Sequence, residues 1–290
     1  MIEELKTFIA VVEKNSFTKA ANSVKLSQPG VSLHISNLEK YFGTQLVERS
    51  NKQRTIRITN TGHILYKSSK QILSILDETK EEIDNYNSLP CGTLKIGASM
   101  TIGEFILPKV LGDFIKEFPN IKIDVTIENT RHIYEKFKNY NIDLALVEGT
   151  VPIENYTIKN FYKDQMIIVS PFSFQYNKNV NLKKFLSNQT WIHREEGSGT
   201  GENLNTFLST ENIYPKNIII LGSNYAIKEA VKNGLGITFI SSLVVNDAIK
   251  NKELKVIPTK TKYYRYFSYL CHEKNLSKLT NLFIKKLNSL

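Results

Sequence analysis

The apolar residues of the first forty positions recur at helical spacing. The first apolar set is Leu5, Phe8, Ile9 and Val12. These positions follow the i, i+3, i+4, i+7 pattern of one helix face. Ser16 is a favourable N-cap and starts a short second helix over residues 17–24. Ala20 and Ala21 are small, so another helix can approach this segment closely.

A third helix is predicted from Gln28 to Phe42, although it opens on a Pro-Gly pair that usually marks a turn. Ser27 is a good N-cap, and Pro29 in the first turn has the φ angle that a helix needs. Gly43 ends the helix. The apolar face consists of Val31, Ile35, Leu38 and Phe42. The Pro-Gly pair is therefore interpreted as a helix start, in which Gly30 costs up to about 1 kcal/mol relative to alanine.

The opposite face of this third helix carries uncharged polar groups at its N-terminal end. Its candidate DNA-contacting residues are Gln28, Pro29, Ser32, Leu33 and Ser36. Amide and hydroxyl groups suit contact with base edges, and helix N–H groups suit phosphates. The alternative is an ordinary solvated helix face. Spacing alone leaves both interpretations open.

A short basic hairpin and a long helix are predicted next. "TIRIT" alternates like a strand, and the basic residues around it are Arg49, Lys52, Arg54 and Arg57. Such a wing fits beside phosphates or in a minor groove. Thr59 or Asn60 caps the long helix, and its apolar stripe comprises Ile64, Leu65, Ile72, Ile75, Leu76 and Ile83. A stripe of this length predicts pairing with a second copy of the helix.

Strands and helices alternate over the remaining two hundred residues. Strands are predicted at 93–99, 121–130, 142–149, 165–171, 190–195, 217–223 and 236–242. Helices are predicted at 104–118, 131–140, 182–188, 201–210, 225–234 and 276–290. This alternation favours a parallel α/β sheet, and its restart near residue 165 favours two similar lobes.

The candidate ligand site lies at the carboxyl ends of these strands, where open α/β sheets bind their ligands. The candidate ligand-binding residues are Ser99, Met100, Thr101, Asn129, Thr130, Glu148, Arg194, Ser198, Gly199, Thr200 and Ser223. Hydroxyl groups and helix N–H groups make a site for a small anion or polar metabolite. The alternative for each residue is a plain helix cap, and for Arg194 a salt bridge with Glu195 or Glu196.

The composition and motifs of the chain favour some classes of function and argue against others. The 290 residues carry a formal net charge of +10, which favours polyanionic partners or acidic ligands. "GSGTG" lacks the lysine of a phosphate-binding loop, and the five histidines show no metal spacing. No catalytic set is apparent, so an enzyme is not expected. The two cysteines are expected to be reduced and inert, the alternative being a redox-sensing pair.

No apolar run is long enough to predict a membrane span. The N-terminal segment has acidic residues where a signal peptide has basic ones. We therefore expect a cytoplasmic protein.

The first sixty residues resemble the winged helix-turn-helix of LysR-type transcriptional regulators. The resemblance rests on the Ala-Ala pair, on "SQPGVS" at the start of the third helix, and on "TNTG" after the wing. It implies that Gln28, Pro29, Ser32 and Leu33 lie at the DNA. Gly30 replaces the usual alanine, and many relatives have arginine where Leu33 stands.

The rest of the chain resembles the effector-binding domain of the same family, which is similar to periplasmic solute-binding proteins. "GTLKIGAS" and "GSGTG" carry this resemblance. The subgroup includes regulators of cysteine biosynthesis, sulfite reduction and carbon fixation. The family resemblance implies that the chain binds promoter DNA and a small-molecule effector. It also implies that the chain forms a homodimer or homotetramer, and RNA polymerase is an additional candidate partner. No cofactor is expected; the effector candidates are sulfur-containing and carboxylate anions.

The predicted fold class is a multi-domain α+β protein. The winged helix-turn-helix is assigned to residues 1–60, the linker or dimerisation helix to 61–90, and the two-lobed α/β effector-binding domain to 91–290. Chain crossovers between the lobes are predicted near 160–164 and 264–268. The competing hypothesis is a solute-binding or transport protein, which explains two lobes but not the first sixty residues.

Overall fold

The computed structural model describes residues 1–49, 56–84, 90–154, 156–175, 181–272 and 276–290. The chain divides into two compact units, Met1–Tyr86 and Asn87–Leu290. Each unit has its own core and is described by itself. No helix in the described ranges is both long and apolar enough to cross a membrane.

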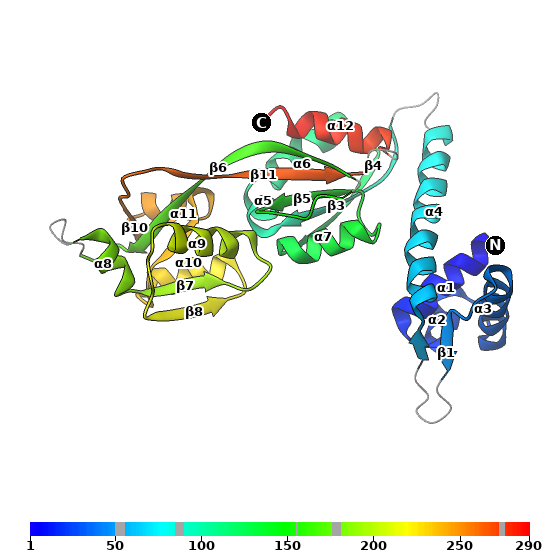
Figure 1. Ribbon diagram of the computed structural model, residues 1–290. Helices are drawn as coiled ribbons and strands as arrows, with labels where there is room; N and C mark the ends of the chain where they lie inside the picture. Colours follow the sequence, from blue (N-terminus) through cyan, green and yellow to red (C-terminus); the bar gives the residue numbers. More distant parts are fainter. Residues whose placement is uncertain (50–55, 85–89, 155, 176–180, 273–275) are drawn as a thin grey trace. The chain divides into compact units, whose positions relative to one another are not determined.

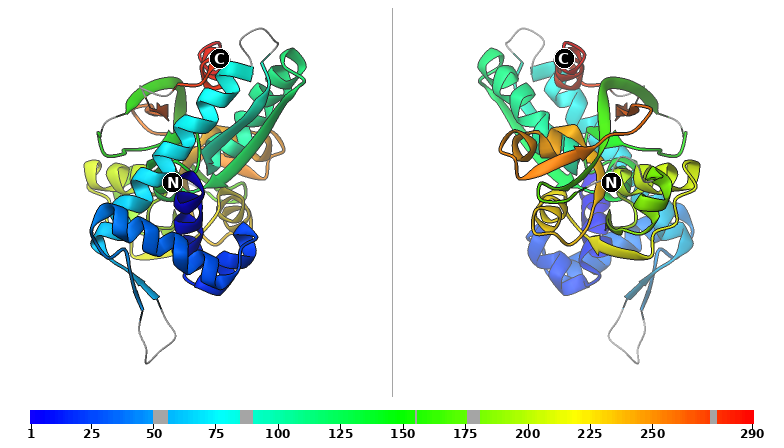
Figure 2. Two further views of the ribbon diagram at one scale, coloured as in Figure 1. Left: turned by 90° about the vertical axis from the view of Figure 1, so that its right-hand side faces the viewer. Right: turned by 90° about the vertical axis from the view of Figure 1, so that its left-hand side faces the viewer.

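The first unit contains three short helices, a hairpin and a long helix (Figures 1 and 2). The helices are α1 (Ile2–Lys14), α2 (Phe17–Val24), α3 (Gln28–Phe42) and α4 (Asn60–Asp84), and the hairpin strands are β1 (Val47–Arg49) and β2 (Ile56–Ile58). The apolar faces of α1, α2 and α3 meet in one core with the base of the hairpin. Ala20 and Ala21 are buried there, consistent with a close approach between helices.

Local capping explains where these helices begin and end. Ser16 accepts a hydrogen bond from the Lys19 N–H at 3.3 Å, and Ser27 accepts one from the Gly30 N–H at 3.2 Å. Gly43 follows α3 in the left-handed region with φ of 66°. The predicted helix start at the Pro-Gly pair is therefore confirmed.

Two details of the first unit differ from the prediction or refine it. Helical spacing places Phe42 on the apolar face of α3, but it is 46% exposed, because it lies in the last turn, beyond the core, with its ring against Tyr41.

Thr59, and not Asn60, caps α4, since its Oγ1 accepts a hydrogen bond from the Gly62 N–H at 3.0 Å. Gly62 is required there because a Cβ would overlap the Leu46 carbonyl oxygen.

The apolar stripe of α4 is mostly uncovered within the first unit. Leu65 packs into the core, near the hairpin end of the helix. The other members are exposed by 40% or more: Ile64, Ile72, Ile75, Leu76 and Ile83. An exposed apolar row of this length is the surface expected to pair with a second copy.

The second unit is built on a mixed sheet with strand order β10-β6-β11-β5-β3-β4, to which β9 adds beside β6, and on a separate parallel pair, β7-β8. The strands are β3 (Gly92–Ser99), β4 (Ile121–Glu128), β5 (Leu144–Glu148), β6 (Thr157–Pro171), β7 (Thr190–Arg194), β8 (Asn217–Leu221), β9 (Thr238–Ser241), β10 (Leu254–Ile257) and β11 (Tyr263–Cys271). The helices are α5 (Met100–Phe105), α6 (Leu107–Glu117), α7 (Thr130–Lys138), α8 (Leu182–Ser187), α9 (Gly199–Thr210), α10 (Asn224–Lys232), α11 (Ser242–Lys250) and α12 (Lys278–Leu287).

The predicted parallel pairing holds for part of the second unit, but the larger sheet is mixed. β3 pairs in parallel with β4 and β5, and β7 pairs in parallel with β8, whereas β11 runs antiparallel to both β5 and β6. The prediction missed β10, β11, α11 and the first half of β6. These segments mix charged and apolar residues, which hides the periodicity by which a strand or helix is recognised. β6 and β11 are long because they pass from one lobe to the other (Figure 1).

The single helix predicted for residues 104–118 is two helices. α5 begins directly after β3, and the chain breaks at Ile106 with φ of −111° before α6. Pro108 explains the break, because it lacks the N–H that a continuous helix would need in that turn.

Two groups of apolar residues form the cores of the two lobes. One lies around β3, β4, β5 and helices α6, α7 and α12. The other lies around β7, β9 and helices α9, α10 and α11. β6 and β11 contribute to both, with Phe267 in the first core and Met166 in the second. The segments 160–164 and 264–268 lie in these two strands and pair antiparallel with each other, with a register shift at Phe267/Ser268.

Candidate functional site

The outward face of α3 presents the residues predicted to contact DNA. Gln28, Pro29, Leu33 and Ser36 are exposed, and Ser32 is half-buried. The Gln28 amide donates a hydrogen bond to Ser32 Oγ at 3.2 Å, so the two side chains are held together at the start of the helix. Leu33 is 60% exposed on this face.

The wing is described only in part. β1 and β2 pair antiparallel, with Glu48 opposite Arg57, which confirms the predicted hairpin. Arg49 ends β1. Lys52 and Arg54, the other basic residues predicted to contact DNA, lie outside the described residues.

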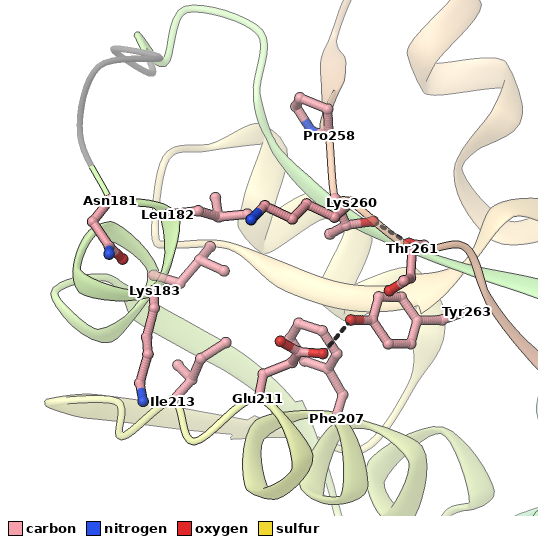
Figure 3. A pocket seen from close by; sticks show the side chains of 12 residues that line it. Asn181, Leu182, Lys183, Phe207, Glu211, Ile213, Pro258, Lys260, Thr261 and Tyr263 are labelled. Carbon is pink, nitrogen blue, oxygen red and sulfur yellow. Dashed lines mark hydrogen bonds between the residues drawn. The ribbon is translucent and has the colours of Figure 1, made fainter.

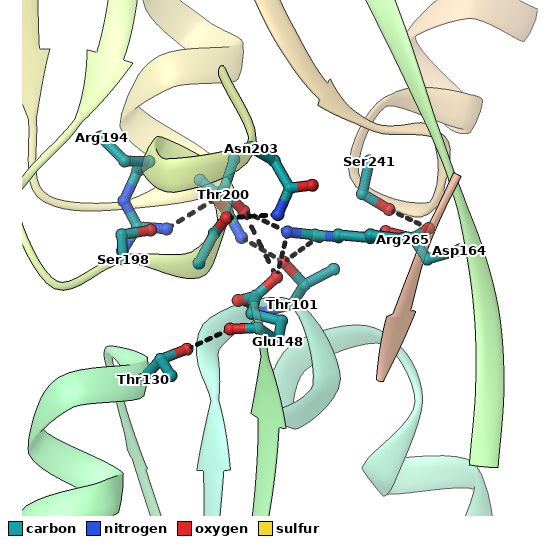
Figure 4. A network of polar contacts seen from close by, with 12 residues as sticks. Thr101, Thr130, Glu148, Asp164, Arg194, Ser198, Thr200, Asn203, Ser241 and Arg265 are labelled. Carbon is teal, nitrogen blue, oxygen red and sulfur yellow. Dashed lines mark hydrogen bonds and ion pairs between the residues drawn. The ribbon is translucent and has the colours of Figure 1, made fainter. Parts of the chain in front are cut away.

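Arg265 is the centre of a buried polar network between the two lobes (Figure 4). Its Nη1 lies 2.6 Å from Glu148 Oε2 and its Nε lies 2.8 Å from Asp164 Oδ2. The guanidinium also donates to Thr200 Oγ1 at 3.0 Å and to Thr101 Oγ1 at 3.2 Å. These four partners come from β5, β6, α9 and α5, so one side chain joins both lobes and a crossover strand. We call this set the interlobe network.

Both carboxylates of the interlobe network are held by several groups. Glu148 also accepts from Thr200 Oγ1 at 3.3 Å, and the Thr101 N–H lies 3.4 Å from its other oxygen. Asp164 accepts from Ser241 Oγ at 2.7 Å. Burial raises the pKa of Asp164, whereas Arg265 and the Ser241 hydroxyl counteract this rise. One guanidinium therefore serves two carboxylates that are each about 1% exposed.

A second arginine extends the network into the other lobe. Arg194 Nη1 donates to Asn224 Oδ1 at 2.7 Å, and Asn224 in turn donates to Thr101 Oγ1 at 3.1 Å. Arg194 also pairs with Glu195 at 2.8 Å, which is one of the alternatives expected from the sequence. Glu196 instead pairs with Arg131.

The predicted effector-binding residues lie in or beside this network, with different local roles. Thr101, Glu148, Arg194 and Thr200 are direct members. Thr130 donates to the Glu148 carbonyl oxygen at 2.8 Å.

The helix-cap interpretation also applies to some of these residues. The residues whose side chains cap helices are Asn129 on α7, Ser198 on α9 and Ser223 on α10. Asn129 additionally donates to Glu195 Oε1 at 3.3 Å. Met100 lies in α5, where it is half-buried. Ser99 is completely buried, and its hydroxyl has no hydrogen-bond partner among the described residues.

Gly199 explains why a glycine-rich loop precedes α9. A Cβ at this position would overlap the carbonyl oxygen of Glu148. The loop therefore lets the start of α9 approach the end of β5, and so brings Thr200 within reach of Glu148 and Arg265.

Three members of the interlobe network were not predicted from the sequence as site residues: Asp164, Ser241 and Arg265. One signal was present. Arg265 is a charged residue within a segment that is otherwise almost entirely apolar or aromatic, and buried charges are paired in folded proteins. Its pairing with Asp164, 101 residues away, could not be read from local spacing.

No group of three or more potential metal-binding side chains gathers in the part of the chain that the structure describes. The site, as described, consists of hydrogen-bond donors, carboxylates and guanidinium groups. Such a site can bind polar organic molecules by charge-assisted hydrogen bonds.

Comparison with known protein families assigns both units. Residues 2–63 match the family of bacterial regulatory helix-turn-helix proteins of the LysR type, and residues 87–289 match the LysR substrate binding domain. The HTH-type transcriptional regulator CysL of Bacillus subtilis is 41% identical over 255 residues, covering 87% of this chain and 84% of the relative. A probable RuBisCO transcriptional regulator of Cyanidium caldarium is 31% identical, covering 94% and 92%.

Solved structures agree on the fold. ArgP of Mycobacterium tuberculosis superposes with a TM-score of 0.77 at 16% identity, covering 99% of this chain and 95% of ArgP. A full-length OxyR variant of Pseudomonas aeruginosa superposes with a TM-score of 0.73 at 17% identity, covering 100% and 93%. The chain therefore belongs to the LysR family, whose members are DNA-binding transcriptional regulators with an effector-binding domain and are not enzymes.

Proposed function

We propose that a small polar or anionic metabolite binds between the two lobes at the interlobe network and changes the action of this regulator on its promoter. The observation that carries this proposal is the position of Arg265, which contacts residues of both lobes at once. A ligand that alters these contacts favours one arrangement of the lobes over another, and this difference in binding is what shifts a conformational equilibrium.

The chemistry of the network favours a carboxylate or a sulfur-containing anion as effector. Guanidinium groups and hydroxyl donors bind such anions by charge-assisted hydrogen bonds. The buried Ser99 hydroxyl, which has no partner among the described residues, adds a donor beside Thr101. One structure of similar fold is described as LysG of Corynebacterium glutamicum with bound effector Arg, and another as the Synechocystis CcmR regulatory domain in complex with 2-PG.

The proposed DNA contacts are those of the exposed α3 face. Gln28, Pro29, Ser32, Leu33 and Ser36 would face bases and phosphates, and the wing residues Arg49, Lys52 and Arg54 would lie at the backbone or in a minor groove. The exposed stripe of α4 would join two copies, and a homotetramer would bind two half-sites. Contact with RNA polymerase and a cytoplasmic location complete the proposal.

Electrophoretic mobility shift with the DNA upstream of the gene tests this function. The full-length protein should bind with an affinity that falls steeply with salt, because Lys and Arg groups release counterions. A panel of sulfur metabolites and carboxylates should then contain a compound that changes the shift.

Two variants locate the effector site. Thr101→Val and Ser99→Ala should weaken the effector response and leave basal DNA binding unchanged. A normal response in both variants would place the effector site elsewhere.

A further inference from the structure

A cavity of about 750 Å³ opens on the second lobe, away from the interlobe network (Figure 3). It lies between α8, the end of α9 and the segment that joins β10 to β11. Its apolar floor is formed by Leu182, Leu186, Phe207, Ile213 and the ring of Tyr263. None of its lining residues belongs to the interlobe network. Its size lies within the range of small-molecule sites, which are mostly apolar with a few polar groups.

One of the charged groups at this cavity forms a hydrogen bond to a neighbouring side chain, whereas two others have no ion-pair partner among the described residues. Glu211 accepts a hydrogen bond from the Tyr263 hydroxyl at 2.5 Å. Lys183 and Lys260 also line the cavity, and neither forms an ion pair with any residue that the structure describes. The Lys260 side chain extends across the cavity toward Leu182 (Figure 3). The cavity thus combines an apolar floor, one carboxylate that is already hydrogen-bonded, and two ammonium groups that lack a counter-ion among the described residues.

We propose that this cavity is a second ligand site, which binds a small monocarboxylate with an apolar tail. The tail would lie on the floor of Leu186 and Ile213, where burying a methylene group stabilises a complex by about 0.8 kcal/mol. The carboxylate would pair with the ammonium group of Lys260, and Lys183 would add positive charge at another part of the cavity (Figure 3). An amine would be repelled by the same lysines, and a strongly hydrated anion without a tail would leave the floor uncovered.

Isothermal titration calorimetry of the full-length protein with butanoate, hexanoate and octanoate tests the tail. The expected result is saturable binding whose Kd falls by up to about fourfold for each added methylene, as area burial requires. A Kd that does not depend on chain length, or the absence of saturable binding for all three acids, would overturn the proposal.

Charge recognition is tested with three ligands that each contain six carbon atoms. Hexanoate should bind more tightly than hexan-1-ol, and hexylamine should bind most weakly. Equal binding of hexanoate and hexan-1-ol, or tighter binding of hexylamine, would contradict the assignment of the lysines.

Variants of the cavity lysines provide a matched comparison. Lys183→Gln and Lys260→Gln keep the side chains polar and should each weaken hexanoate binding by about two- to fivefold, the range of exposed ion pairs. Lys184→Gln and Lys262→Gln change exposed neighbours that do not line the cavity and should bind hexanoate like the parent protein. Equal effects in the two pairs would show that general charge, and not this cavity, attracts the acid.

This result is separable from the proposed effector function. Titration of the cavity is read by calorimetry without DNA, whereas the interlobe effector is read by the DNA shift and by Thr101→Val. Either test can fail while the other succeeds.

Discussion

Arg265 and Glu148 form an ion pair at 2.6 Å between two side chains that are almost completely withdrawn from water. Asp164 shares the same guanidinium. Desolvation of such charges is costly, and the cost is offset only while every partner is in place. The network therefore couples the stability of the second unit to the arrangement of its lobes.

Removal of Arg265 should strongly destabilise the second unit. Arg265→Met keeps a long apolar stem but leaves the carboxylates of Glu148 and Asp164 buried without their cation, and this should cost about 3–5 kcal/mol. Calorimetric unfolding measures the loss. Lys138→Met, which breaks the more exposed pair with Glu154, is the control and should cost no more than about 1 kcal/mol. Similar losses of unfolding free energy in the two variants would show that the buried network stabilises the unit no more than an exposed ion pair does.

The raised pKa of Asp164 predicts a pH dependence of stability. Burial raises the pKa of this group above its ordinary value of 3.8, so the folded state holds the proton more tightly than the unfolded state. The stability that protonated Asp164 contributes is therefore fully present below pH 3.8. It is lost as the pH rises through the higher pKa of the folded state. Urea unfolding should therefore show a smaller loss of stability from about pH 4 to neutrality in Asp164→Asn than in the parent. The same substitution at exposed Asp113 is the control, and a parental slope in Asp164→Asn would refute the assignment.

Replacement of Gly30 by alanine should stabilise α3. A Cβ at this position would meet Ser27 Oγ at 3.3 Å, a tight contact that a small shift of the cap can relieve. Alanine is favoured over glycine in helices by up to about 1 kcal/mol. Thermal unfolding and the DNA shift assay should show a more stable protein with equal or better DNA binding. Weaker DNA binding by a stable Gly30→Ala protein would mean that the glycine allows close approach to the DNA backbone.

A charge within the exposed stripe of α4 should disrupt self-association. Ile72 is 43% exposed on that stripe, and Ile72→Lys would bury an ammonium group between paired helices. Sedimentation velocity should show a shift toward smaller species. Gln71→Lys introduces the same charge at the neighbouring exposed position and should leave the assembly unchanged. An unchanged assembly in Ile72→Lys would place the dimer contact on another surface.

The first unit could be predicted almost completely from local sequence. The starts of α2, α3 and α4 depend on hydrogen bonds between residues three apart, such as Ser27 with Gly30, and these spacings are visible in the chain. Phe42 shows the limit, since helical spacing places it on the core face although the core does not extend to the end of α3. A periodicity gives the direction of a side chain but not where its neighbours stop.

Part of the candidate effector site could likewise be predicted from local sequence, and part could not. The sequence by itself determined which residues stand at strand ends and helix starts, and thus pointed to Thr101, Glu148 and Thr200. Only the tertiary structure decided that Arg265 and Asp164 meet there, because an antiparallel pairing of β6 and β11 joins residues 101 positions apart. Capping is a short-range interaction and is encoded locally, whereas the partner of a buried charge is set by the packing of the whole unit.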